Sequence, residues 1–488
     1  MSATAQLLVP ALRADADGRF AGSRDQALAA LALGAGGFVL YGGEQDAVRA
    51  FTKEMQQRSR TPLLIGADLE RGAGQQFAGA TGLPPLAALA WLGDAEALRR
   101  AARLTAREAR TMGVNWDHAP VVDLDFPDDA AVGGTRSLGT EPASVARMAA
   151  EWITACQAEG VLACAKHFPG HGRAPQHVVG AVPNVGADRD TLHATDLLPF
   201  RAAIDAGVAS MMTAHAAYPA LDPSGLPATY SRELLQWLLR QQMRYDNLIV
   251  AYGPAMIRAP GGAADEGEAV VRAIGAGCDL VVAPDDMTGV VAALDRALAD
   301  RRLDPERVRQ SGRRRLKWAQ WASPPNDWRR PTASDAAWGA QLADRVVHAV
   351  RATPAPLPLR IDVRTVDGAA PGEAPDRRSF LDTLRTAGFD AQPVDDADAA
   401  ADDTPMVVAL HPGAAAEYGG AEAVAAAGAR VRAVCDAARR AARRVVVVLF
   451  AHPRLADVAP DDVPVVCAWT GDTAMQRAAA RWLAAART

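Results

Sequence analysis

The part of the sequence with the strongest chemical character is residues 164–172, which read Cys-Ala-Lys-His-Phe-Pro-Gly-His-Gly. The apolar run before it, Gly160 to Ala165, is typical of a buried strand. The proline and glycines that follow predict a turn. Ligands of parallel α/β folds bind at the carboxyl ends of strands. Lys166, His167 and His171 are therefore candidate ligand-binding residues.

Polar groups also follow other predicted strands. Asp68 follows the strand over 62–67, Arg136 lies in the loop Gly134 to Gly139, and His215 follows the sixth strand. Together they offer donors and acceptors for a polyhydroxylated ligand. Asp68 could instead cap a helix, and Arg136 could pair with a surface carboxylate. Lys166 needs a partner, because burying an unpaired ammonium costs free energy.

The histidines do not have the spacing of a metal site. Pro169 and Gly170 break any helix between His167 and His171, so these two are not a helical ligand pair. The five cysteines show neither metal-ligand nor redox spacing. The glycine-rich residues 34–43 match neither a P-loop nor a dinucleotide-binding fingerprint. We therefore expect no metal, and hydrogen-bonding roles for the histidines.

Short apolar segments alternate with helical patterns over the first two-thirds of the chain. This alternation indicates parallel βαβ units. About eight units in roughly 320 residues fit a (β/α)8 TIM-type barrel better than an open doubly wound sheet. The predicted strands are residues 6–9, 36–41, 62–67, 113–124, 160–166, 209–213, 247–251 and 279–283.

A second α/β domain is predicted after the barrel. Residues 1–320 form the barrel in this prediction, 321–340 a linker and 341–488 a smaller C-terminal α/β sandwich. The linker is inferred from the proline-rich and polar residues 321–334. A helix over 335–350 is expected next. The later predicted strands are residues 359–363, 405–410, 444–449 and 463–469.

Composition restricts the classes of partner. The chain has 488 residues, 49% hydrophobic and 22% charged, with a net charge of −5. No basic patch with interleaved aromatic residues points to nucleic acid, and no apolar run is long enough to span a bilayer. The N-terminus lacks a signal-peptide pattern, and the scattered cysteines suit a reducing compartment. We predict a cytoplasmic protein with a small ligand; its oligomeric state is open, with a monomer favoured.

Taken together, these stretches resemble glycoside hydrolase family 3, in particular its cytoplasmic β-N-acetylhexosaminidase branch. The resemblance covers residues 5–320 well and 340–488 more weakly. It implies a (β/α)8 barrel, a retaining two-step hydrolysis without metal or organic cofactor, and sugar binding by Asp68, Arg136, Lys166 and His167. The stretches that carry it are residues 65–70, 119–123, 134–139, 166–172, 196–200 and 276–280.

The catalytic positions depart from the family pattern. In this branch the loop after the second glycine ends in Asp-Ser-His, whose histidine is the general acid/base. Here the loop over 173–179 carries His177, Val178 and Val179 at those positions. The family's nucleophilic aspartate follows the seventh strand, where this chain has Tyr252. A retaining glycosidase needs both a nucleophile and a proton donor, and valine can be neither.

Three hypotheses remain open. The first is a degenerate homologue that recognises a β-linked amino sugar such as N-acetylglucosamine, which explains the retained binding residues. In the second, the protein is a glycosidase with altered catalytic residues, Tyr252 and His177. Tyrosine nucleophiles are known, although an unperturbed pKa near 10 needs an activating base. In the third, the protein is a scaffold with no ligand at these strand ends. Four further carboxylates could assist catalysis on the second hypothesis: Asp117, Glu70, Asp265 and Glu266.

The retained Asp68, Arg136 and Lys166 argue against the third hypothesis, because nothing in a scaffold requires them at strand ends, and the loss of two catalytic positions favours the first. On this hypothesis Tyr252 fills the space of a lost substrate group, and its hydroxyl bonds to a neighbour.

Overall fold

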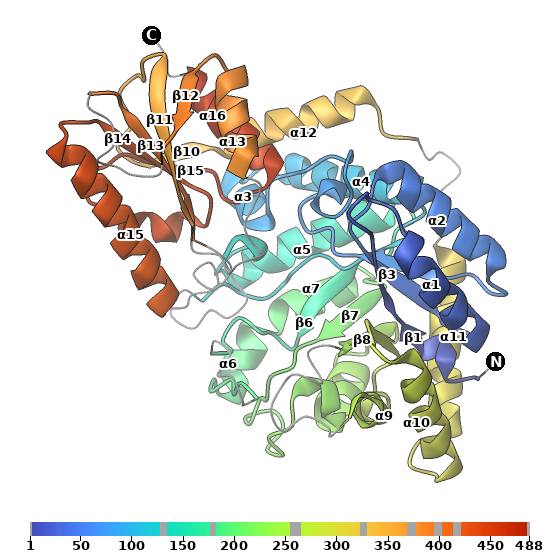
Figure 1. Ribbon diagram of the computed structural model, residues 1–488. Coiled ribbons are helices and arrows are strands. Elements are labelled where there is room, and N and C mark those ends of the chain that lie inside the picture. The colour runs from blue at the N-terminus through green and yellow to red at the C-terminus, as the bar shows by residue number, and fades with distance from the viewer. Residues whose placement is uncertain are drawn as a thin grey trace. The chain divides into compact units, whose positions relative to one another are not determined.

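The chain forms two compact units, which are described separately. A computed structural model describes residues 2–126, 134–175, 182–253, 265–322, 329–367, 377–394, 403–412 and 421–485 (Figure 1). The first unit contains most of the chain up to Thr332. The second contains Ala333–Thr488 together with Gly82–Asp94 and residues 134–137 from the first part of the sequence.

The first unit is built on parallel strands. Every strand pair within it is parallel. The strands are mostly buried on both faces, which is why they appear in the sequence as nearly continuous apolar runs. In the described residues they are β1 (Leu8–Val9), β2 (Ala11–Arg13), β3 (Gly37–Tyr41), β4 (Leu64–Ala67), β5 (Trp116–Asp117), β6 (Cys164–Phe168), β7 (Ser210–Thr213), β8 (Leu248–Tyr252) and β9 (Leu280–Val282).

These strands form two sheets, with the orders β2-β3-β4-β5 and β1-β9-β8-β7-β6. Backbone contacts continue from the β5 edge to the β6 edge: the Asp117 N–H donates to the Leu162 carbonyl at 2.7 Å, and Val121 forms a parallel bridge with Lys166. The predicted parallel α/β fold is confirmed. Each predicted strand has a counterpart, and β2, which follows Pro10, is a further strand that was not predicted.

Helices alternate with these strands and lie around them in Figure 1. Local signals define several of their ends. Helix α5, for example, has Pro142 at its first position, and the Glu141 side chain accepts the N–H groups of Ala143 and Ser144. The main helices are α1 (Ala21–Leu33), α2 (Gln45–Arg58), α4 (Ala95–Thr111), α5 (Pro142–Gln157), α6 (Arg189–Ala194), α7 (Leu198–Asp205), the π-helix η5 (Glu233–Gln242), α9 (Glu266–Ala276), α10 (Met287–Ala299) and α11 (Pro305–Trp321).

The second unit is a mostly parallel sheet with the order β10-β15-β14-β13-β11-β12. Its strands are β10 (His348–Arg351), β11 (Arg360–Asp367), β12 (Asp390–Pro393), β13 (Met406–His411), β14 (Val445–Leu449) and β15 (Val465–Cys467). Its helices are α3 (Leu86–Leu92), α12 (Ala333–Val346), α13 (Arg377–Thr386), α15 (Ala421–Arg440) and α16 (Thr473–Ala485), with the short turns η3 (Gly134–Arg136) and η6 (Pro453–Val458).

Two hydrophobic cores cover the two faces of this sheet. Alternate residues of β14 belong to different cores: Val446 and Val448 pack with α12, α13 and α16, whereas Val445, Val447 and Leu449 pack with α15. This is the period-2 alternation of a strand buried on both sides. The second unit is therefore a three-layer sandwich, as the sequence predicts.

The end of α12 corrects one prediction. The helix was expected to reach residue 350, but it ends at Val346, and His348–Arg351 form strand β10. Strand β10 pairs antiparallel with β15, and the indole N–H of Trp469 donates to the Val346 carbonyl at 2.9 Å. Pairing with a distant strand outweighs the local helical pattern, and this pairing is not visible in the sequence around residue 348.

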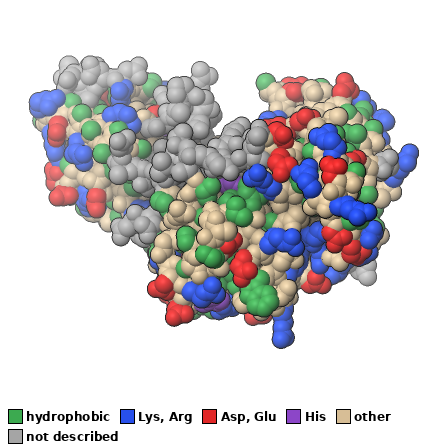
Figure 2. Space-filling model, turned by 90° about the horizontal axis from the view of Figure 1, so that it is seen from below, with side chains coloured by type: hydrophobic (Ala, Val, Ile, Leu, Met, Phe, Trp, Pro, Cys, Tyr) green, Lys and Arg blue, Asp and Glu red, His purple; other side chains and the backbone are tan. Residues whose placement is uncertain are grey.

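The surface carries charges of both signs. Figure 2 shows lysine, arginine and acidic side chains interspersed over the face in view. Large exposed hydrophobic side chains of the described residues include Trp91, Trp237 and Trp321, which lie on different helices. In the described residues, no helix is both long and apolar enough to cross a membrane. All five cysteines are buried and unpaired.

Candidate functional site

The centre of the candidate site is an ion cluster at the C-terminal ends of β4 and β6. Lys166, in β6, is only 2% exposed. Its Nζ lies 3.0 Å from Oδ1 of Asp68 and 2.8 Å from Oε1 of Glu70, both of which follow β4. The buried ammonium is thus shared by two carboxylates, which offset its desolvation.

Burial and charge act in opposite directions on the carboxylates here. Burial alone would raise the pKa of Asp68, but the charge and hydrogen bond of Lys166, together with His118, hold that pKa below its usual value. Asp117, at the end of β5, is fully buried, and burial raises its pKa to about 8. Burial also lowers the pKa of His118 to about 4. At neutral pH Asp68 is therefore ionised, whereas Asp117 holds a proton and His118 is neutral.

Asp123 organises the histidine loop. Its side chain is buried, and its Oδ1 accepts the backbone N–H groups of His167 at 3.0 Å and His171 at 2.7 Å. Its Oδ2 lies 2.7 Å from Nδ1 of His167. Burial would raise the pKa of Asp123, but the two histidines hold it lower. This carboxylate fixes the direction of the His167 ring.

Glycine permits the close turn that follows. Gly170 has φ +127°, a conformation that other residues rarely adopt, and a Cβ at Gly172 would lie 1.8 Å from the Leu124 carbonyl oxygen. The Tyr218 hydroxyl donates to the Gly170 carbonyl at 2.9 Å. Arg173 donates from Nε to Asp196 at 2.9 Å. The Pro-Gly-His-Gly segment is therefore held by contacts on both sides.

Two tyrosines meet near this cluster. Tyr252 is the last residue of β8 and Tyr41 the last of β3. Tyr252 lies close enough to Tyr41 to act on the pKa of its hydroxyl. Burial, together with the nearby charge of Asp68 and the neighbouring Tyr252, raises the pKa of Tyr41 well above its usual value. The residue at the expected nucleophile position therefore has a second, neutral phenol beside it.

The remaining predicted residues have different surroundings. His215 follows β7 and is buried, with its ring edge-to-face on Tyr230 at 5.4 Å. Arg136 is the last residue of η3. It belongs to the second unit, whereas Lys166 belongs to the first. His177 lies outside the described residues.

The four further carboxylates divide into two kinds. Glu70 joins the Lys166 cluster and Asp117 lies buried beside it. Asp265 caps α9 by accepting the Glu268 N–H at 2.7 Å. Glu266 accepts two backbone N–H groups, of Asp285 and Asp286, each at 2.7 Å. Asp265 and Glu266 thus have structural partners of their own.

Sequence reasoning did not single out Asp123 and Tyr41 as site residues. The position of both residues was a usable signal, because each is a polar residue at the end of a predicted strand, as Asp68 is. For Asp123 it was obscured by the length of the predicted fourth strand, 113–124, of which only Trp116–Asp117 form β5.

The arrangement suits recognition of hydroxyl groups. Asp68 and His167 are the partly exposed members, with 28% and 19% of their side chains accessible, whereas Lys166 and Glu70 support them from below. A carboxylate acceptor next to charged or ring N–H donors can bond several hydroxyls at once. In the described residues no three His, Cys, Asp or Glu side chains are grouped as a metal ion would require.

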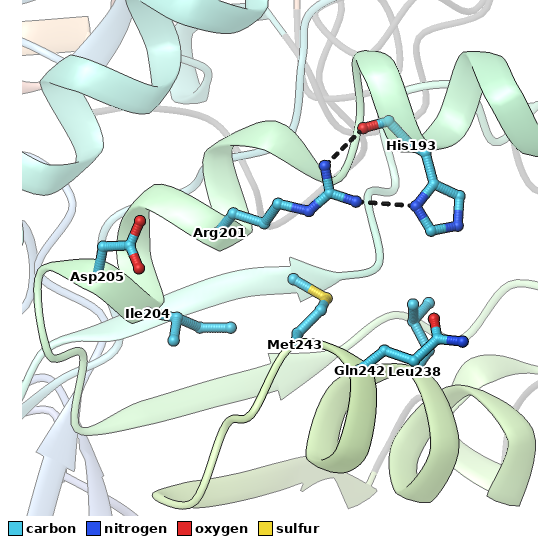
Figure 3. Close-up of a pocket in the computed structure, with 7 residues that line it drawn as sticks. All are labelled: His193, Arg201, Ile204, Asp205, Leu238, Gln242 and Met243. Atoms are coloured by element: carbon cyan, nitrogen blue, oxygen red, sulfur yellow. Dashed lines mark hydrogen bonds between the residues drawn. The ribbon is translucent and has the colours of Figure 1, made fainter.

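A separate hollow of about 260 Å³ lies between helices on the flank of the first unit (Figure 3). Arg201 donates from Nη1 to the His193 carbonyl at 3.0 Å, and its Nη2 lies 2.8 Å from the Nδ1 of the same residue. Ile204, Leu238 and Met243 add apolar walls. Because its residues come from helices and not from strand ends, this hollow is separate from the Lys166 cluster.

Comparison with known proteins gives a consistent family. Residues 4–317 match the N-terminal domain of glycosyl hydrolase family 3. A beta-N-acetylglucosaminidase/beta-glucosidase from Cellulomonas fimi is 35% identical over 267 residues, which are 52% of this chain but only 46% of that protein. A beta-hexosaminidase from Thiobacillus denitrificans is 37% identical over 264 residues, 50% of this chain and 70% of that protein. This chain thus matches less than half of the Cellulomonas protein.

Solved structures extend the likeness to the whole chain. A family 3 beta-N-acetylglucosaminidase from Paenibacillus superposes with a TM-score of 0.80 at 25% identity, covering 100% of this chain and 96% of that one. NagZ from Neisseria gonorrhoeae, in complex with N-trifluoroacetyl-D-glucosamine, gives a TM-score of 0.56 at 26% identity, covering 69% and 98%.

Proposed function

Since this chain belongs to glycoside hydrolase family 3, we propose that it binds a β-linked amino sugar such as N-acetylglucosamine at the strand ends around Lys166. We further propose that it has lost the ordinary retaining hydrolysis of such sugars. The contrast between two groups of residues supports both parts of this proposal. Asp68 and Lys166 form an ion pair, whereas the residue where we expect the nucleophile is Tyr252, which lies beside Tyr41.

The sugar class follows from the relatives and the chemistry of the site. Related proteins are named beta-hexosaminidase, and one related structure holds an N-acylated glucosamine analogue. Asp68 and His167 reach solvent beside the buried Lys166, and Asp123 orients the His167 ring. Such rigid, charge-assisted donors and acceptors suit the hydroxyls of a pyranose.

The tyrosine pair supports the proposed loss of hydrolysis. A retaining mechanism needs a nucleophile that attacks the anomeric carbon and a proton donor for the leaving oxygen. Tyrosine ionises near pH 10 when unperturbed and needs a base to act earlier. The phenol of Tyr41, with its raised pKa, is no such base, because the negative charge of Asp68 nearby disfavours ionisation of Tyr41.

The test combines binding with restoration of the nucleophile. N-acetylglucosamine should raise the melting temperature of the wild type by binding its folded state, and Asp68→Asn should reduce this shift. Wild type and Tyr252→Phe should not hydrolyse a dinitrophenyl β-N-acetylglucosaminide. Tyr252→Asp should hydrolyse it, because this leaving group needs no proton donor.

Two results would contradict the proposal. Wild-type turnover that Tyr252→Phe and His177→Ala each reduce would show an active glycosidase with a tyrosine nucleophile. A melting temperature unaffected by any amino sugar would show that the strand ends hold another ligand or none.

A further inference from the structure

A polar pocket of about 360 Å³ lies in the first unit, at the end opposite the Lys166 cluster. It lies at the N-terminal ends of β8 and β9, whereas Tyr252 and Lys166 stand at C-terminal strand ends. Volumes of a few hundred Å³ are typical of small-molecule sites. Charged residues dominate the lining: Arg240, Arg244, Asp246, Arg307 and Arg314.

Three of these arginines share one buried carboxylate. Asp279, fully buried just before β9, accepts from Arg307 Nη2 at 3.0 Å, from Arg314 Nη1 at 3.2 Å and from Arg240 Nη2 at 2.5 Å. Burial would raise the pKa of Asp279, but the three guanidinium groups hold it below its usual value. The carboxylate is therefore ionised, and it neutralises only one of the three positive charges.

The rest of the lining does not remove this excess. Arg244 has no side-chain partner among the described residues, and Arg307 donates only through Nη2 there, so its Nη1 is available. Asp246 pairs with Arg314 at 2.9 Å, but its side chain is 88% exposed to water. Among the described residues, the four guanidinium groups of the lining are thus balanced by two carboxylates, Asp246 and the buried Asp279.

From this imbalance we propose that the pocket binds a small phosphate-bearing anion. The guanidinium fork matches the oxygens of a phosphate, with two parallel donors each. Two positive charges beyond those neutralised by Asp246 and Asp279 match the charge of one phosphate group. Among the described residues that line the hollow of Figure 3, by contrast, the one arginine, Arg201, is already bonded to His193. That hollow therefore lacks a free guanidinium.

The experiment is titration calorimetry of the full chain with inorganic phosphate and with pyrophosphate, at constant ionic strength. Arg244→Gln removes an unpaired guanidinium and should weaken binding about tenfold, the usual order for a charged hydrogen bond. Asp246→Asn removes a competing carboxylate and frees Arg314. This variant should therefore bind phosphate more tightly than the wild type.

Arg301→Gln is the matched control. Arg244 and Arg301 are both exposed arginines in the left-handed backbone region, with φ 56° and 60°, and neither side chain has a partner among the described residues. Phosphate also stabilises proteins by exclusion from their surface, and that effect would be equal in all variants. Equal binding by wild type, Arg244→Gln and Arg301→Gln, or no binding at about 1 mM phosphate, would overturn the proposal.

Discussion

The two ends of the first unit hold buried ion clusters with opposite composition. At the C-terminal strand ends one ammonium, that of Lys166, lies between the carboxylates of Asp68 and Glu70. At the N-terminal ends one carboxylate, that of Asp279, lies among three guanidinium groups. The parallel strands of the first unit therefore present two different chemistries at their two ends.

The difference indicates which kind of ligand each end of the strands can bind. A sugar without charge needs acceptors and donors in balance, and the Lys166 cluster with His167 offers both. A phosphate needs an excess of cations, and the arginine cluster has it. Conversely, a buried carboxylate held by three cations tolerates the loss of one, whereas carboxylates that share a single lysine do not. Three predictions test this contrast.

The largest expected effect compares one cation from each end. Lys166→Met leaves Asp68 and Glu70 without the ammonium between them and should cost about 3–5 kcal/mol of unfolding free energy. Arg314→Met leaves Asp279 bonded to two other arginines and to the Ser311 hydroxyl, and should cost about 1 kcal/mol. Urea unfolding of both variants measures the difference.

Lys166→Arg is the control, since it keeps the charge and should fold more stably than Lys166→Met. Equal destabilisation by Lys166→Met and Arg314→Met would remove the electrostatic contrast between the ends. Amino-sugar binding should survive Arg314→Met, and its loss there would mean that the two ends are not independent.

The next prediction concerns the pH dependence of two buried aspartates. Folded Asp117 keeps its proton up to about pH 8, whereas an unfolded aspartate releases it near pH 4. Between these values the folded state binds more protons, so its stability falls as pH rises, by up to about 1.4 kcal/mol per pH unit. The side chain of Asp117→Asn cannot ionise. The unfolding free energy of this variant should therefore rise relative to that of the wild type from pH 5 to pH 8.

Asp279→Asn should behave differently. Because the pKa of Asp279 is lowered, it is ionised in both folded and unfolded states over this range, and its contribution is lost only under more acidic conditions. The difference between wild type and Asp279→Asn should therefore be constant from pH 5 to pH 8. His118 titrates in the wild type and in both variants, so its contribution cancels from each difference in unfolding free energy. A constant difference for Asp117→Asn would show that this carboxyl is ionised when folded.

The smallest expected effect is the response of ligand binding to salt. Raising NaCl from about 0.1 M to about 1 M shortens the Debye length from about 10 Å to about 3 Å. Phosphate binding at the arginine pocket should weaken about tenfold, since both partners are charged. Binding of N-acetylglucosamine should change less than about twofold, because the sugar carries no charge. Calorimetry at the two salt concentrations compares them, and equal weakening would argue against two distinct chemistries.

Much of the fold could be predicted from the sequence because its signals are local. Apolar runs such as 247–251 and 445–449 are buried on both faces, so their composition alone indicates strands of a parallel sheet. Proline and glycine at 169–172 restrict the backbone directly, and they predicted the turn that Gly170 and Gly172 form. Lys166 needed a partner for the same elementary reason that burying a charge is costly.

The identity of those partners was decided only by the tertiary structure. Lys166 meets Asp68 across 98 residues of sequence, and Asp123 meets His171 across 48. Tyr252 lies beside Tyr41 because strands β8 and β3, which carry them, end near the same point. Strand β10 forms because it pairs with β15. The arginines of the N-terminal strand ends lie together because each bonds to the buried Asp279. Each of these depends on contacts between distant segments, which no local pattern of residues encodes.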